Sequence, residues 1–99
     1  METSVSENKH AAIAKYLTGQ IENHGIEHQR DFNLCAHSFK VQTPNDSLLL
    51  KISDEFIDDH QIHDILKQLD KWGLAALLIQ DSDRIVFVGK NGVQFLVRG

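Results

Sequence analysis

One amphipathic segment near the middle of the chain constrains the fold more than any other feature. Its apolar residues recur at helical spacing, as Ile62, Ile65, Leu66, Leu69 and Trp72. Asp58 and Asp59 suit the start of a helix, because carboxylates are stabilised at its positive end, and Gly73 suits a helix stop. The sequence therefore predicts a helix over about 59–72 with one apolar face.

The first part of the chain predicts a second helix, over about 6–24. Ser4 and Glu7 have the spacing of a capping box, and Ile13, Leu17 and Ile21 then recur every four residues. Gly25 fits a left-handed helix stop, which would leave His24 in the last turn and His28 in a loop.

Three other segments indicate strands. Phe39 and Val41 alternate with polar neighbours, which predicts a strand somewhere within 33–42. The turn residues of 43–47 follow, so 48–52 is expected to return as the second strand of a hairpin. The continuous apolar run 74–79, bounded by Gly73 and the polar turn 81–83, predicts a central strand buried on both faces.

The C-terminal part of the chain predicts another hairpin. Asn91 and Gly92 favour a type I′ turn between strands over about 84–90 and 93–98. In that register Lys90 pairs with Val93 and Phe87 lies opposite Leu96. Ile85, Phe87 and Leu96 then share one face of the sheet.

These elements predict a single α+β domain over residues 1–99, in the order α-ββ-α-βββ. The simplest assembly is a five-stranded, mostly antiparallel sheet in the order 2-1-3-4-5, with two helices packed on it. The face that carries Ile85, Phe87 and Leu96 is too apolar for a solvent face. Either the first helix or a second protein chain should cover it, and these residues are the predicted interaction site.

Composition and charge restrict the kinds of partner that this chain is expected to bind. The formal net charge is −4 and the Lys and Arg residues are scattered, so nucleic acid is not expected as a partner. No apolar run approaches the roughly 18 residues of a membrane span, and the N-terminus has no signal-peptide pattern. With a single cysteine, Cys35, the chain is expected to be soluble and cytoplasmic, without membrane contact.

Three groups of residues could carry chemistry. His60 and His63 are three apart beside two aspartates, and His24 and His28 are four apart, but neither pair comes with the further ligands that a zinc site needs. Cys35 and His37 would point to one side of a strand, and a histidine can activate a cysteine nucleophile, yet no oxyanion-hole motif accompanies them. The acidic pairs of segment 54–59 are explained by a solvated helix entry. We expect no metal, no cofactor and no catalytic residue.

The sequence therefore predicts a small, acidic, non-enzymatic protein-interaction domain, either a homodimer or the adaptor or inhibitor of a protein partner. A small enzyme or a metal-binding domain that uses His60 and His63, or Cys35 and His37, remains the alternative. Small acidic dimeric secretion chaperones share part of this element order, but that likeness of order carries no site across.

Overall fold

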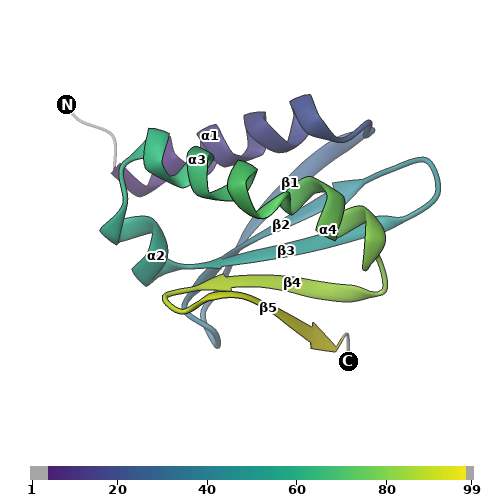
Figure 1. Cartoon of the computed structure of the whole chain (residues 1–99). Coiled ribbons are helices and arrows are strands. Elements are labelled where there is room, and N and C mark those ends of the chain that lie inside the picture. The colour runs from purple at the N-terminus through teal and green to yellow at the C-terminus, as the bar shows by residue number, and fades with distance from the viewer. Residues whose placement is uncertain (1–4, 98–99) are drawn as a thin grey trace.

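The chain folds as an α+β structure with helices on one face of a five-stranded sheet (Figure 1). The structure is a computed structural model and describes residues 5–97. Its elements are α1 (Val5–Gln20), β1 (Gly25–Asp31), β2 (Ala36–Gln42), β3 (Ser47–Ser53), α2 (Asp54–Asp59), α3 (Ile62–Trp72), α4 (Leu74–Gln80), β4 (Arg84–Gly89) and β5 (Gly92–Val97). The strands lie side by side in chain order, β1 to β5.

The core lies between the helix layer and the sheet. The three residues of the predicted stripe are buried, Ile13 and Leu17 in α1 and Ile21 directly after it, and α3 buries Ile65 and Leu69. These side chains meet the buried face of the central strands, which consists of Phe39, Val41, Leu48, Leu50, Ile52, Val86 and Val88. Each such side chain contributes about 1.5–3 kcal/mol when fully buried, so this layer holds the helices on the sheet. The capping interaction predicted for Ser4 and Glu7 falls outside what the structure describes.

The predicted helix over about 59–72 is present as α3, but it begins at Ile62, and Asp58 and Asp59, expected at its start, instead end the short helix α2. Ser53 caps α2, because its Oγ accepts a hydrogen bond from the Phe56 backbone N–H at 3.1 Å. Near the other end of α2, the buried Lys9 of α1 donates from Nζ to the Ile57 carbonyl at 2.7 Å. Together with the buried side chains of Phe56 and Ile57, these contacts fix α2 beneath the end of β3.

The predicted central strand over 74–79 is wrong, because this segment forms helix α4. Gly73, with φ of 63°, ends α3 in the left-handed conformation and lets the chain enter a second helix at once. Leu74 and Leu78, four residues apart, are buried, whereas Ile79 is 56% exposed. A short apolar run does not distinguish a buried strand from a helix, and here the helix propensity of Leu and Ala prevails.

The sheet is mixed, so the prediction of a mostly antiparallel sheet in the order 2-1-3-4-5 is also wrong. Helices α2, α3 and α4 connect β3 to β4, which run parallel, whereas every other neighbouring pair is antiparallel. The segment expected as a helix stop and a loop forms β1 instead. Because α1 ends at Gln20, His24 lies beyond the helix, and His28 lies in β1.

The predicted C-terminal hairpin is present, but its register differs by two residues from the prediction. Gly89 pairs with Gly92, so Lys90 and Asn91 form the turn, and Val88 pairs with Val93. Gly92 has φ of 110°, while Cys35 is the only described non-glycine residue with positive φ, so the turn is not type I′. A shift of two residues preserves the side-chain alternation, and each strand therefore keeps its predicted face.

Candidate interaction surface

The sheet has one face without a helix. Helices α1, α3 and α4 lie together on the other side, where α1 packs on α3, β1 and β2 (Figure 1). Helix α1 therefore does not cover the second face, which was one of the two covers expected from the sequence. We call this second face the open face: α1, α3 and α4 leave it bare, and only the start of α2, at Asp54 and Glu55, is described at its border, in a hollow shared with Phe87.

An apolar strip crosses the open face over its last three strands. Leu49 of β3 lies opposite Ile85 of β4, which lies opposite Leu96 of β5. Phe87 lies one row further along β4, between Lys51 and Gln94. We define the apolar strip as Leu49, Ile85, Phe87 and Leu96, all of which are half-buried. The strip contains the three predicted interaction residues on one surface, although Phe87 faces Gln94 rather than Leu96.

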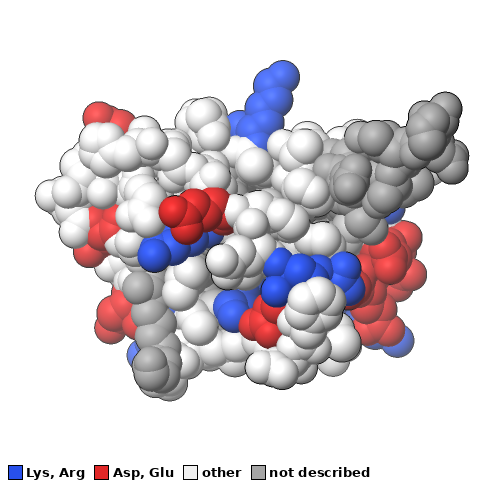
Figure 2. All heavy atoms as spheres, turned by 180° about the vertical axis from the view of Figure 1, so that it is seen from behind, with Lys and Arg blue, Asp and Glu red and all other residues white. Residues whose placement is uncertain are grey.

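The open face is polar over β1 and β2. Glu27 lies opposite Lys40 in the row that continues into Leu49, and Lys51 donates from Nζ to Asp31 Oδ2 at 2.5 Å. Seen from behind, basic and acidic side chains lie next to each other, without a broad basic area (Figure 2). This arrangement gives the open face one apolar half and one half that carries acidic and basic side chains, including the ion pair of Lys51 and Asp31.

A hollow adjoins the apolar strip at the end where β4 turns into β5. Its volume is about 400 Å³, and its lining includes Leu34, Cys35, Ser53, Phe87, Gly89 and Lys90. The Phe87 ring lies against the backbone of Gly89, since a Cβ placed there would come within 3.0 Å of ring atom Cε2. Gly89 thus provides the room that lets Phe87 lie along the strand and form one wall of the hollow.

The loop between β1 and β2 presents further apolar side chains beside this hollow. Asp31 Oδ1 accepts hydrogen bonds from the backbone N–H groups of Asn33 and Leu34, at 3.0 and 3.1 Å. The hydrogen bond from Lys51, together with these backbone contacts, lowers the pKa of Asp31. The fixed loop leaves Phe32 81% and Leu34 43% exposed.

Three histidines gather at the other side of the sheet, under α1. His28 of β1 stacks on His10 of α1 with ring centroids 3.9 Å apart, and His28 Nε2 lies 2.8 Å from His37 Nδ1 of β2. His37 Nε2 lies 3.4 Å from Oδ1 of Asp54, whose other oxygen accepts a hydrogen bond from Arg30. We call His10, His28, His37 and Asp54 the histidine cluster.

Electrostatics keeps the central rings of this cluster neutral near pH 7. Burial, together with the neighbouring His10, His37 and Arg30, lowers the pKa of His28 to about 4. Burial also lowers the pKa of His37, against the opposing effect of Asp54. One neutral imidazole can donate its N–H to the unprotonated nitrogen of another, so a hydrogen bond can link β1 to β2, while His10 joins α1 to the cluster by ring stacking.

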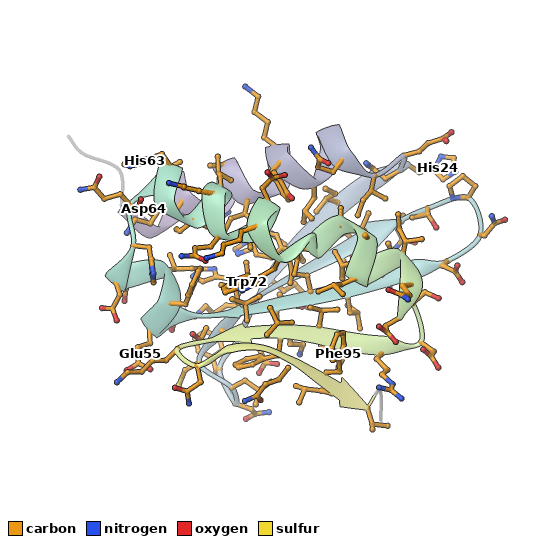
Figure 3. All side chains as sticks on the ribbon, viewed as in Figure 1. His24, Glu55, His63, Asp64, Trp72 and Phe95 are labelled. Atoms are coloured by element: carbon orange, nitrogen blue, oxygen red, sulfur yellow. The ribbon has the colours of Figure 1, made fainter. Side chains whose placement is uncertain are left out.

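The predicted histidine pairs do not converge on a common site. His60 Nδ1 donates to the Phe56 carbonyl at 2.8 Å and its ring stacks on Phe56, while His63 lies 3.3 Å from Asp64. His63 and His24 lie at opposite ends of the molecule (Figure 3). Among residues 5–97, no group of three or more His, Cys, Asp or Glu side chains is arranged to hold a metal ion.

The structure also separates Cys35 from His37. Cys35 is exposed in the turn before β2, with φ of 50°, and its Sγ lies 3.9 Å from the Phe32 carbonyl. His37 is buried, and both of its ring nitrogens face other partners, His28 and Asp54. The expectation that the two side chains share one side of a strand is wrong, because the strand begins only at Ala36.

The histidine cluster was missed at the sequence level. It depends on β1, in which Ile26, His28 and Arg30 alternate with polar residues that face the other way. That alternation was the available signal, but only one member of it is apolar.

Trp72 points toward the sheet as a core residue (Figure 3) and packs near Phe56, with ring centroids 5.9 Å apart.

Comparisons with known protein families, with curated proteins and with solved structures found no match to this chain. None of the described helices has both the length and the apolar character required to cross a membrane. The surfaces described above are therefore the basis for a function.

Proposed function

We propose that the protein is a non-enzymatic protein-interaction domain that binds another protein chain through the open face of its sheet. That chain is either a second copy or a protein for which this domain is adaptor or inhibitor. The observation that carries this proposal is the apolar strip of Leu49, Ile85, Phe87 and Leu96, which lies on the face that α1, α3 and α4 leave bare.

Three features support contact with a protein. The strip lies beside the hollow walled by Phe87, and exposed Leu34 extends the apolar surface across it. Buried aromatic anchors beside a pocket are typical of the strongest contacts in protein interfaces. The acidic and basic side chains over β1 and β2, with the ion pair of Asp31 and Lys51, form a polar border, which resembles the rim of an interface more than the basic surface that nucleic acid requires.

The test is a charge placed in the strip. Phe87→Glu would place a carboxylate beside Lys51, whose ammonium group is already bound to Asp31, so the new charge would be poorly compensated in any interface on the open face. An uncompensated buried charge costs about 3–5 kcal/mol. The protein is used as bait in an extract of its native host, and self-association is followed by light scattering. We expect Phe87→Glu to lose the captured protein or the self-association while its circular dichroism remains that of the folded parent.

Ile79→Glu is the matched control. Ile79 is also apolar and is 56% exposed, but it lies on α4, on the helix side of the sheet. It should keep the binding that Phe87→Glu loses. Equal binding by the parent and by Phe87→Glu would show that the open face is not the contact, and the proposal would be wrong.

A further inference from the structure

We propose that β5 is a site of strand addition, at which β5 of a second copy of this chain pairs antiparallel about a two-fold axis. This surface is the outer edge of the sheet, distinct from the open face, so the proposal goes beyond the function proposed above. It joins two domains into one continuous sheet.

The two edges of the sheet differ in how they resist pairing. Edge strand β1 carries Glu27, Arg30 and Asp31, and charged side chains on an edge strand discourage the addition of another strand. Edge strand β5 has the sequence Gly-Val-Gln-Phe-Leu-Val and carries no charge from Gly92 to Val97. Of the two edges, only β5 lacks charged protection.

β5 also leaves apolar side chains exposed. Val93, Phe95 and Val97 lie on the face that the helices cover in the neighbouring strands, and Leu96 lies on the open face. The helix layer packs on β1 to β4, so β5 extends beyond it, with Phe95 40% and Val97 85% exposed. Phe95 lies at this border of the sheet (Figure 3). Gln94 shares the open face with Leu96, so β5 is apolar mainly on its helix side, where Phe95 and Val97 are left exposed.

The charge pattern identifies a second copy as the occupant. A two-fold axis brings like residues near one another, so a charged strand would meet its own charge, whereas β5 brings none. With Phe95 on the axis, Val93 of one copy lies opposite Val97 of the other, which makes β-branched and aromatic cross-strand pairs. Uncharged apolar side chains are thereby self-complementary across the axis.

This pairing has a geometric consequence for the open face. A two-fold axis perpendicular to the sheet keeps the helices of both copies on one side. In this register Leu96 of each copy lies opposite Gln94 of the other, so the two apolar strips lie on the same face of the joined sheet, with Gln94 at their boundary. The dimer therefore leaves the open face free for a different protein.

The experiment compares two substitutions at Val97 by sedimentation equilibrium over micromolar to near-millimolar concentrations. Val97→Glu charges the edge, and because Val97 lies opposite Arg84, the new carboxylate is compatible with the β4–β5 hairpin of the monomer. Val97→Thr keeps a β-branched, neutral side chain. We expect the parent and Val97→Thr to dimerise and Val97→Glu to dissociate with a Kd at least about tenfold higher.

Hydrogen exchange gives a second measurement. Amides of Gly92–Val97 should exchange more slowly at concentrations where the parent is dimeric, and this protection should be absent in Val97→Glu. A monomeric parent, or a dimer that is unchanged in Val97→Glu, would overturn the proposal. A dimer lost in Phe87→Glu but kept in Val97→Glu would place self-association on the open face, so the edge proposal would fail while the proposed function stands.

Discussion

His28 Nε2 and His37 Nδ1 lie 2.8 Å apart across strands β1 and β2, a contact that two protonated rings cannot make. Both nitrogens of a charged imidazole are donors, so at least one ring must be neutral for a hydrogen bond between them. His10 stacks on His28 from above, and Arg30 adds positive charge beside both rings. Acid therefore acts on the hydrogen bond between β1 and β2 and on the stacked ring by which His10 joins α1 to them.

We expect the free energy of unfolding to fall as the pH is lowered from about 6.5 toward about 4. The pKa of His28 is lowered to about 4 in the folded state, below the ordinary value of 6.5, so the unfolded chain binds more protons in this window. The loss is about 1 kcal/mol per pH unit at most, because His28 is partly exposed to screening solvent. Denaturant-induced unfolding at a series of pH values measures this loss of unfolding free energy.

His28→Phe should flatten that pH dependence, because it removes the titrating ring but keeps an aromatic side chain beside Phe39. His63→Gln is the control, since His63 is exposed at the start of α3, away from the cluster. An acid dependence in His28→Phe as steep as that of the parent would show that other groups control stability in this range.

Gly92→Ala should destabilise the domain by about 1–3 kcal/mol, since alanine resists the φ of 110° with which Gly92 leaves the β4–β5 turn. No atom crowds the position of a Cβ there, so the effect tests backbone conformation alone. Gly19→Ala is the matched substitution, because Gly19 is exposed in α1 and lacks positive φ. It should stabilise by up to about 1 kcal/mol. Equal melting temperatures for the two variants would contradict this account of the turn.

Leu69→Ala should cost about 2–5 kcal/mol, because Leu69 is fully buried between α3 and the sheet and its loss leaves a cavity. Ile79→Ala, at an exposed position of α4, should change stability by less than about 0.5 kcal/mol. Chemical denaturation of the parent and both variants gives the comparison. A Leu69→Ala variant as stable as the parent would mean that the apolar face of α3 does not face the core.

The parts of the fold that were predictable are those in which one pattern dominates. The stripe from Ile62 to Trp72 predicted α3, and Asn91 with Gly92 predicted the C-terminal hairpin, although the turn itself is formed by Lys90 and Asn91. The faces of Ile85, Phe87 and Leu96 were predictable for the same reason, because alternation survives a register shift of two residues. Three residues of the apolar strip could thus be derived from local sequence, whereas Leu49 joins them only through the pairing of β3 with β4.

The remaining parts depend on tertiary contacts. Leu74–Gln80 carries no period that separates helix from strand, and its state follows from Gly73 and from the packing of Leu74 and Leu78 on the sheet. β1 is polar because it is an edge strand, so it lacks the apolar signal by which strands are recognised. The histidine cluster could not be found once β1 was missed.

The parallel pairing of β3 with β4 also determines when the sheet can be completed during synthesis of the chain. β3 ends at Ser53 and β4 begins at Arg84, so every residue of α2, α3 and α4 must be synthesised before β3 acquires its second neighbour. Until then the apolar run Leu48, Leu49 and Leu50 lies on an unpaired edge, which is the kind of segment that aggregates. In a chain that grows from its N-terminus, β3 is therefore covered only when the C-terminal hairpin forms and β4 pairs with it. Truncation before Arg84 should yield an insoluble product.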